Sequence, residues 1–342
     1  MTGLDFKAAL EGVLTGKDLP GADAEVLFGA MLDGQLDASQ AAGLLIALRA
    51  KGESPSEISG AARALLARVA PFPRPAGDVL DVCGTGGDGA RTLNVSTAVA
   101  FVAAAAGVRV AKHGNRAISS ACGSADVLAA LGVPIDDSAT VSARRLEELG
   151  VCFLLAPAYH PGLARIMPIR RALGVRTAFN LLGPLVNPAR PTHQLLGVYA
   201  PALVPTVARA LGELGVCRAL VVHGAGTDEI ALHGPTCAAW LEAGALRELE
   251  LVPEDAGIAR APLEALAGGA PGDNARRLLA ILAGREDGPA RDAVALNAGA
   301  ALWVMGVAGS LREGTRRALD LLASGAPARV LARWAGRADG AP

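Results

Sequence analysis

Hydrophobic residues recur at helical spacing through the first 70 residues of the chain, and no strand pattern interrupts them. The spacing between residues 8 and 32 predicts amphipathic helices. Ser54 and Glu57 match a capping box, with Pro55 at the first helical position, so a further helix is expected to begin there. The pattern therefore predicts a small helical domain over residues 1–70.

Beyond the proline-rich segment Pro71–Pro75, which cannot continue a helix, the pattern changes to alternating strands and helices. We expect strands at residues 78–83, 108–111, 151–155, 195–199 and 219–222. Helices are expected at residues 96–106, 139–149 and 203–214, with more helices from residue 274 onward. Such alternation is typical of a mostly parallel sheet flanked by helices. The sequence thus predicts a larger α/β domain over residues 71–342.

Composition and charge narrow the class of protein. Hydrophobic residues make up 51% of the 342 residues and charged residues 19%, which excludes a disordered chain. A net charge of −1 and an aromatic content of 3% argue against nucleic-acid binding. No apolar run approaches the ~20 residues of a membrane span and no signal peptide is evident, so we expect a cytoplasmic protein without a membrane partner. The five cysteines contain no C-x-x-C pair, and we expect free thiols.

The loop Gly84-Thr85-Gly86-Gly87-Asp88-Gly89 follows the first predicted strand of the α/β region. Glycines let the backbone turn sharply and direct N–H groups at phosphate oxygens, and the next helix brings its positive end close. A plain turn between a strand and a helix needs no ligand and remains an alternative at this point. The loop matches neither a P-loop nor the G-x-G-x-x-G fingerprint of dinucleotide sites.

Two further polar clusters stand next to predicted helices and strands. Asn94-Val95-Ser96-Thr97 lies where the next helix starts and could cap that helix or hold a phosphate or a metal ion. Lys112-His113-Gly114-Asn115-Arg116 follows the next strand, with Ser119, Ser120 and Ser124 behind it. A charged surface loop without a ligand is the alternative interpretation of this cluster. Because the carboxyl ends of parallel strands line the crevice in which α/β sheets bind ligands, the clusters together predict a site for a polyanion such as a diphosphate.

Asp228-Glu229 follows the strand predicted at residues 219–222. Adjacent carboxylates at a strand end could hold magnesium that neutralises a diphosphate, and a solvated acidic turn is the alternative. Arg170-Arg171 could bind a planar carboxylate, although arginines on helix surfaces often need no ligand. The histidines lack metal-ligand spacing and no G-x-S-x-G elbow is present, so a covalent nucleophile is not predicted.

The order and spacing of these motifs closely resemble the anthranilate phosphoribosyltransferase family. The resemblance rests on GTGGD at 84–88, NVST at 94–97, KHGNRAISS at 112–120, GSADVLAALG at 123–132, RTAFNLLGPLVNP at 176–188 and DE at 228–229. It implies a helical domain, joined in space by helices from about residues 161–183, on a larger α/β domain, and a homodimer joined through the helical domain. It also implies transfer of a phosphoribosyl group from 5-phosphoribosyl 1-diphosphate to the amine of anthranilate, a step of tryptophan synthesis.

The resemblance also assigns roles to residues. Ser96, Asp228 and Glu229 would serve a pair of magnesium ions per subunit, while Gly84, Asn115 and Arg170 would contact anthranilate. The phosphoribosyl donor would be held by Gly84, Gly87, Asp88, Thr92, Asn94, Val95, Ser96, Thr97, Lys112, His113, Gly114, Asn115, Arg116, Ala117, Ile118, Ser119, Ser120 and Ser124.

The implied reaction is a displacement at a sugar carbon through a cation-like transition state, which mainly needs leaving-group stabilisation and positioning. Because an arylamine is neutral near pH 7, we expect no side chain to be indispensable as acid or base, and no catalytic residue is assigned. Two alternatives stay open: an enzyme like pyrimidine nucleoside phosphorylase, and a non-catalytic paralogue that binds nucleic acid. The cluster at residues 112–116 and the pair Asp228-Glu229 favour a diphosphate donor over the first, and the balanced charge argues against the second.

Overall fold

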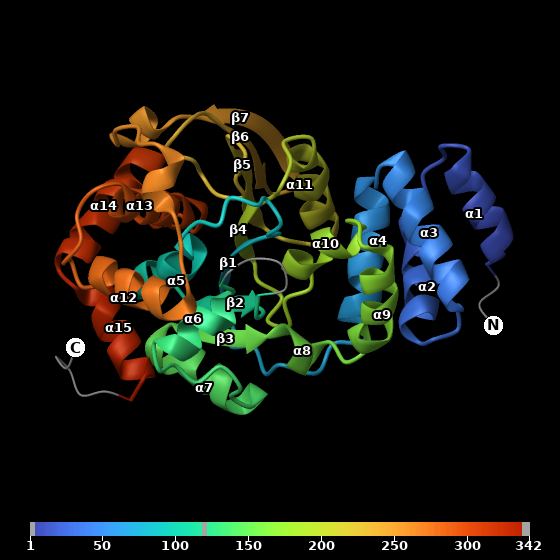
Figure 1. Cartoon of the computed structure of the whole chain (residues 1–342), viewed down its shortest axis with the longest axis horizontal. Coiled ribbons are helices and arrows are strands. Elements are labelled where there is room, and N and C mark those ends of the chain that lie inside the picture. Colours follow the sequence, from blue (N-terminus) through green and yellow to red (C-terminus); the bar gives the residue numbers. More distant parts are fainter. Residues whose placement is uncertain (1–3, 118–121, 337–342) are drawn as a thin grey trace.

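The structure, a computed structural model of the chain, describes residues 4–117 and 122–336. Four helices form the end of the molecule that lies opposite the C-terminus (Figure 1). They are α1 (Phe6–Leu14), α2 (Gly21–Leu32), α3 (Ala38–Lys51) and α4 (Pro55–Leu66). A later part of the chain joins them, because α9 (Leu163–Leu173) packs against α2 and α3, and α10 (Phe179–Leu182) contacts α4.

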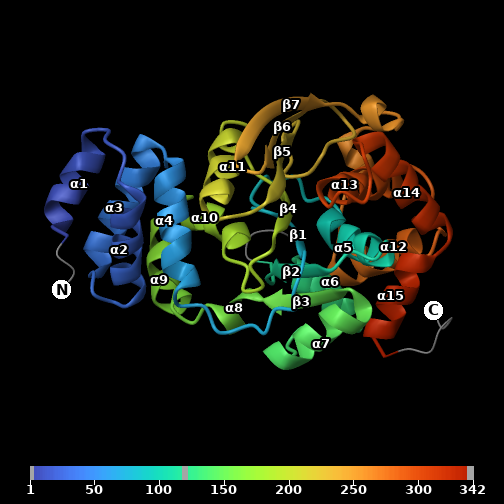
Figure 2. The same cartoon turned by 180° about the vertical axis from the view of Figure 1, so that it is seen from behind.

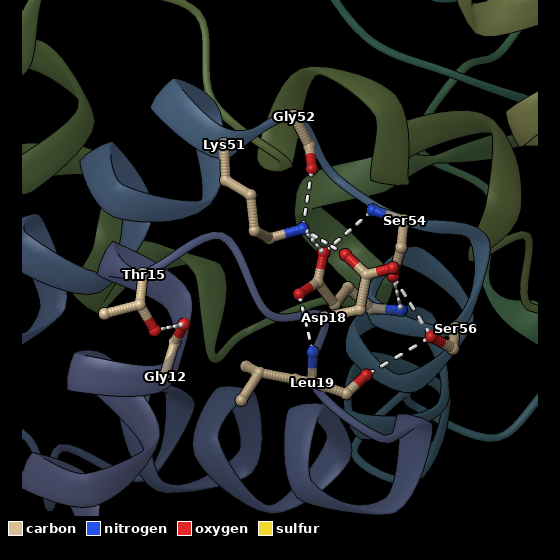
Figure 3. A network of polar contacts seen from close by, with 9 residues as sticks. Gly12, Thr15, Asp18, Leu19, Lys51, Gly52, Ser54 and Ser56 are labelled. Carbon is tan, nitrogen blue, oxygen red and sulfur yellow. Dashed lines mark hydrogen bonds and ion pairs between the residues drawn. The ribbon is translucent and has the colours of Figure 1, made fainter.

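A buried polar network fixes the turns between these helices (Figure 3). The Lys51 ammonium donates to Asp18 Oδ1 at 2.6 Å and to Glu57 Oε2 at 3.0 Å. The Glu57 carboxylate is 1% exposed and also accepts the backbone N–H groups of Leu19 and Ser54, each at 2.8 Å. One carboxylate thus connects the loop before α2, the end of α3 and the start of α4, with every charge paired.

A seven-stranded sheet forms the centre of the molecule, in the order β3-β2-β1-β4-β5-β6-β7. The strands from β3 to β5 in this order are parallel, and β6 and β7 are antiparallel to their neighbours. The carboxyl ends of the parallel strands therefore share one edge. The strands are β1 (Leu80–Gly84), β2 (Val110–Gly114), β3 (Val151–Leu155), β4 (His193–Gly197), β5 (Arg218–Gly224), β6 (Thr236–Glu242) and β7 (Ala245–Leu251).

Helices cover both faces of the sheet. On one face, α5 (Val95–Ala105) packs against α13 (Pro289–Val304) and α15 (Ala326–Trp334), with α12 (Pro271–Leu282) and α14 (Leu311–Ala323) beside them. On the other, α11 (Leu203–Glu213) lies between the sheet and α4 (Figure 2). The remaining elements are α6 (Ser124–Ala130), α7 (Ala139–Leu149), α8 (Ala156–Tyr159), η1 (Gly183–Leu185), η2 (Pro253–Ala256) and η3 (Leu263–Leu266).

The hydrophobic core follows these two layers. One cluster joins α5, α13 and one face of the sheet, and includes Val99, Leu195 and Leu296. A second cluster runs without interruption from Leu44 in the helical end to Leu196 on the opposite face of the sheet. The helical end is therefore attached to the sheet by shared apolar packing, and the boundary placed between residues 70 and 71 stays a prediction.

The predicted fold class is confirmed: a helical N-terminal part precedes a larger α/β part with a mostly parallel sheet. The strand at 151–155 and the helix at 139–149 lie where the sequence placed them. The hairpin β6–β7 was not predicted, because β7 is an edge strand whose exposed Arg and Glu side chains obscure the apolar alternation. Within the described ranges, no helix has the length and apolar character to cross a bilayer.

Candidate active site

The glycine-rich loop after β1 lies at the carboxyl edge of the sheet. Gly86 and Gly87 have φ angles of +66° and +77°, in a region that residues with side chains disfavour. The Gly86 N–H donates to Asp228 Oδ2 at 2.7 Å, and Asp88 Oδ2 accepts the N–H of Asp228 at 3.3 Å. The loop and the acidic pair, which are predicted from distant parts of the sequence, therefore meet in the structure.

Asp228 and Glu229 lie over the ends of three neighbouring strands, at positions where each strand carries glycine. A Cβ added to Gly84 in β1 would overlap the Asp228 carboxylate, and one added to Gly197 in β4 would overlap the Asp228 carbonyl oxygen. A Cβ added to Gly224 in β5 would overlap the Glu229 carbonyl oxygen. The acidic pair thus rests in a cradle that side chains at these strand ends would fill.

The electrostatics of this pair favour a cation. Burial raises the pKa of Asp228 to about 7, helped by the negative charge of Asp88. Burial also raises the pKa of Glu229 to about 8, helped by the charge of Asp228. Among the described residues, no three His, Cys, Asp or Glu side chains gather into a group that could hold a metal by themselves. The pair still fits magnesium, which usually takes one or two carboxylates and completes its shell with water and substrate phosphates.

The start of α5 brings a hydroxyl and a buried cation to the same place. Lys112, from β2, is only 3% exposed and donates from Nζ to Ser96 Oγ at 3.1 Å and to the Val82 carbonyl at 2.6 Å. The Lys112 charge and the backbone of Ser96 both act to lower the pKa of Glu229, against the larger effect of burial. Ser96 and Glu229 line one small cavity at this point. A cation, a hydroxyl, a helix N-terminus and a carboxylate thus converge, an arrangement suited to a metal-bearing polyanion.

Three other predicted residues around α5 are not among those that line this cavity. Thr97 is 1% exposed and lines an interior cavity with Phe101 and Trp334, and Val95 belongs to the hydrophobic core. The backbone of Thr92 pairs with that of Ala267. The side chains of Thr97 and Val95 therefore pack in the interior, and contact of all three residues with a donor stays a prediction.

Asn94 has its side-chain amide engaged on two sides. Its Nδ2 donates to the Cys122 carbonyl at 3.1 Å, and its Oδ1 accepts from Asn274 Nδ2 at 3.0 Å. The side chain therefore links the start of α5 to the loop before α6 and to α12. Donor binding by Asn94 stays a prediction.

The loop after β2 is held by the beginning of α6. The Asp126 carboxylate accepts from Ala117 N at 2.8 Å and from Arg116 Nη1 at 3.3 Å. The Asn115 carbonyl accepts from Ser124 Oγ at 3.3 Å, and a Cβ at Gly114 would overlap that same hydroxyl. These contacts hold the described part of the loop against the start of α6. Three further predicted donor contacts, Ile118, Ser119 and Ser120, lie outside the described residues.

The residues predicted for anthranilate come from three elements. Arg170, in α9, has its guanidinium 5.7 Å from the centre of the Phe179 ring, and burial lowers its pKa. Asn115 is exposed at the end of β2, and its Oδ1 accepts the N–H of Arg116 at 2.8 Å. Within the described ranges, Arg170 forms no hydrogen bond to Asn115 or Gly84. Contact of Gly84, Asn115 and Arg170 with one ligand therefore stays a prediction.

Two buried histidines stand near these residues and remain neutral. The His113 and His160 rings lie edge to face with centres 5.2 Å apart. Burial lowers the pKa of His113 to about 3 and that of His160 to about 4. His113 Nδ1 lies 3.1 Å from the Gly183 carbonyl, so it is the protonated nitrogen of the neutral ring. Neither ring carries a charge near neutral pH, so neither acts as a cationic anchor.

Two residues of the site carry no role in the sequence-based assignment. Asp81 is fully buried in β1 and accepts from Asn187 Nδ2 at 2.9 Å, which ties the segment after η1 to the sheet. Arg176 donates to the Gly87 carbonyl and stacks 4.3 Å from the centre of the Tyr199 ring. An acidic residue inside an apolar strand was a usable signal for Asp81. Arg176 stands at the start of a quoted motif, but only the fold brings it to the glycine loop.

Comparison with known proteins agrees with this geometry. Residues 76–328 match the family described as "Glycosyl transferase family, a/b domain", and residues 7–69 match "Glycosyl transferase family, helical bundle domain". The chain is 56% identical to anthranilate phosphoribosyltransferase of Sorangium cellulosum over 96% of this chain and 94% of that protein. Its identity to the enzyme of Shewanella denitrificans is 47%, over 96% of this chain and 92% of that one.

Solved structures give the same answer. The crystal structure of anthranilate phosphoribosyltransferase from Thermus thermophilus superposes with a TM-score of 0.90 at 45% identity, covering 96% of this chain and 98% of that one. The enzyme from Saccharomyces cerevisiae in complex with PRPP and Mg superposes with a TM-score of 0.87 at 27% identity, covering 97% of both chains. With the motifs, the fold and these relatives in agreement, the chain belongs to the anthranilate phosphoribosyltransferase family.

Proposed function

We propose that this chain transfers the phosphoribosyl group of 5-phosphoribosyl 1-diphosphate to the amine of anthranilate and releases diphosphate. The observation that carries the proposal is the seating of Asp228 and Glu229 in the glycine cradle, next to the loop after β1 and the buried Lys112. These groups offer backbone N–H donors, a fixed positive charge and ligands for a hard cation. A diphosphate ester of a sugar needs all of these as its bond to the sugar carbon breaks.

Each group has a definite task in this reaction. The N–H groups of the glycine loop that are not bonded to Asp228 and the positive end of α5 orient phosphate oxygens, and the Lys112 ammonium offsets their negative charge. Asp228, Glu229 and Ser96 would hold magnesium, with a pair of ions per subunit as the proposed number. When bound, magnesium neutralises the charge that develops on the leaving diphosphate.

The acceptor side needs positioning more than proton transfer. The Arg170 guanidinium, at the end of α9, is suited to the anthranilate carboxylate, and Asn115 lies on the neighbouring loop. The arylamine attacks as the neutral base, and its proton is lost after the new C–N bond forms. Because His113 and His160 stay uncharged, we expect no single side chain to be indispensable as acid or base. One all-or-none loss with a new pH dependence among pocket variants would overturn that expectation.

The remaining proposals concern assembly and location. We propose a homodimer joined through the helical end, where Leu14 is 62% exposed and Ile46 is 39% exposed on α1 and α3. We also propose that the protein works in the cytoplasm, in tryptophan synthesis. A monomeric mass in light scattering would overturn the proposed dimer.

The test of the proposed reaction uses the fluorescence of anthranilate. Purified protein is mixed with anthranilate, 5-phosphoribosyl 1-diphosphate and magnesium, and fluorescence is followed over time. We expect a fall in fluorescence that a chelator prevents and that does not occur with ribose 5-phosphate as donor. If fluorescence persists while another amine or a free base triggers diphosphate or phosphate release, the acceptor assignment is wrong and the donor site stands.

A further inference from the structure

A buried asparagine in α13 forms hydrogen bonds with the backbone of the residue that follows the acidic pair. Asn297 is 1% exposed, and its Oδ1 accepts from Ile230 N at 2.9 Å while its Nδ2 donates to the Ile230 carbonyl at 3.1 Å. The same Nδ2 donates to the Ala293 carbonyl at 3.0 Å, which fixes the orientation of the amide on its own helix. Both backbone groups of the residue after Glu229 are therefore held by one rigid side chain.

The asparagine also borders the cavity in which the acidic pair acts. Asn297, Ser96 and Glu229 line the same small cavity, together with Gly197 of β4. Because α13 is buried along most of its length and packs against β4 and β5, the amide sits on a rigid support. Core packing of α13 therefore fixes the position of the Asn297 amide relative to the sheet edge.

The backbone of Asp228 packs against the end of β4. A Cβ added to Gly197 would overlap the carbonyl oxygen of Asp228, and the three nearest atoms to that Cβ all belong to Asp228. Gly197 is the register partner of Gly84, whose added Cβ would overlap the Asp228 carboxylate. Glycine at β4 therefore allows the backbone of Asp228 to approach the strand, while Asn297 holds the backbone of Ile230.

We propose that Asn297 and Gly197 are positioning residues that fix the Asp228–Glu229 pair in the geometry a metal-bearing donor requires. This inference rests on the proposed function, because it assigns a purpose to the seating of the proposed metal ligands. Residues that orient metal ligands from behind typically change metal affinity about 10–100-fold when they are replaced. Both residues would act through Asp228 and Glu229, so neither is assigned a catalytic role.

The test measures metal binding directly, with Mn2+ as a spectroscopic substitute for magnesium. Electron paramagnetic resonance counts free Mn2+ during titration of protein saturated with 5-phosphoribosyl 1-diphosphate, for the wild type and for Asn297→Leu and Gly197→Ala. We expect both variants to bind Mn2+ about 10–100-fold more weakly than the wild type. Steady-state assays are expected to show a raised KM for magnesium together with a lower kcat.

Two matched variants control for stability. Thr315→Val changes a buried side chain packed beside α13, and Gly212→Ala adds a Cβ in α11 that meets Leu241 Cδ1 at 3.3 Å. Both are expected to alter the melting temperature while Mn2+ affinity stays within about twofold of the wild type. If Asn297→Leu fails to fold, Gly197→Ala decides, because the three atoms nearest to its added methyl group all belong to Asp228.

The outcomes separate this inference from the proposed function. If wild-type protein binds Mn2+ and both Asn297→Leu and Gly197→Ala bind it as tightly while only their melting temperatures fall, the positioning role is wrong and the proposed function stands. If the wild type binds no Mn2+ in the presence of donor, the proposed function fails first and the positioning role fails with it.

Discussion

Polar clusters have different roles in the helical end of this molecule and at the carboxyl edge of its sheet. In the helical end, Lys51 and Glu57 are buried with every hydrogen bond made, and the network closes without any ligand. At the sheet edge, Asp228 and Glu229 are brought together beside Asp88, and burial and mutual repulsion raise their pKa values. The first region is complete in the free protein, whereas under the proposed function a bound cation completes the second.

The balance of charge in a polar cluster indicates whether the cluster stabilises the fold or binds a ligand. A cluster whose charges cancel stabilises the fold, and removing one member should lower stability without a specific effect on the reaction. A cluster of like charges held by a rigid cradle opposes stability in the free protein, so its retention points to a ligand. Substitutions in the helical end should therefore lower stability, whereas substitutions at the sheet edge should lower activity.

The largest expected effect is on activity at the sheet edge. Replacing the acidic pair, as Asp228→Asn with Glu229→Gln, should lower kcat/KM by about 10³-fold or more, because the magnesium that neutralises the leaving group is no longer held. At pH 8 in chelator the double variant should melt no lower than the wild type, since it lacks the adjacent half-buried like charges. A variant that loses activity and also melts many degrees lower would contradict this, and parallel kinetics and calorimetry measure both.

The next effect concerns stability in the helical end. Glu57→Gln should lower the free energy of unfolding by about 2–3 kcal/mol, because the Lys51 ammonium, 8% exposed, loses its buried carboxylate partner. Urea unfolding provides the measurement. The value of kcat per folded molecule should stay unchanged. The control is Glu25→Gln, which breaks the half-exposed pair with Arg63 and should cost less than about 1 kcal/mol.

A pH dependence of intermediate size follows from the raised pKa values. Asp228 and Glu229 shift from 3.8 and 4.5 to about 7 and about 8, so the folded protein retains protons that the unfolded chain releases. Stability from this pair is therefore fully present below about pH 4 and is lost as pH rises through about 7 to 8. In chelator, the melting temperature of the wild type should fall more steeply across that window than the melting temperature of the double variant. Parallel curves for the two proteins would contradict the assignment.

The smallest expected effect lies at the loop anchor. Arg176→Lys keeps the charge but weakens the planar stacking on Tyr199 and the bond to the Gly87 carbonyl. We expect KM for the donor to rise about two- to fivefold with little change in kcat, because the anchor is exposed and contributes about 0.5–1 kcal/mol. Initial rates at saturating anthranilate measure this. An unchanged KM would show that the glycine loop does not depend on Arg176.

The fold was largely predictable because the chain changes its periodicity clearly after Pro71–Pro75. The alternating apolar runs and helices placed the parallel strands to within a few residues, and strand-end reasoning brought the glycine loop to Asp228. The hairpin β6–β7 escaped prediction because charged side chains on an exposed edge strand do not mark a core face.

The support of the site was not predictable from the sequence. Asn297 lies 67 positions beyond Ile230, and an asparagine inside an apolar helix has no local feature that names its partner. Gly197 reads as an ordinary glycine until the strand register puts it beside Gly84, under Asp228. Short motifs identified the groups proposed to face the ligand, whereas tertiary packing determines the groups that hold them.

We expect a magnesium-bearing donor to complete the half-buried acidic pair, and calorimetry measures this binding. Magnesium-saturated 5-phosphoribosyl 1-diphosphate is titrated into wild type and into the Asp228→Asn, Glu229→Gln variant near pH 7, in two buffers of different ionisation enthalpy. We predict tight binding to the wild type with a buffer-dependent heat, because the cation displaces protons from carboxyls whose pKa values are raised. Equal affinity for both proteins, or a heat that does not depend on the buffer, would contradict the account.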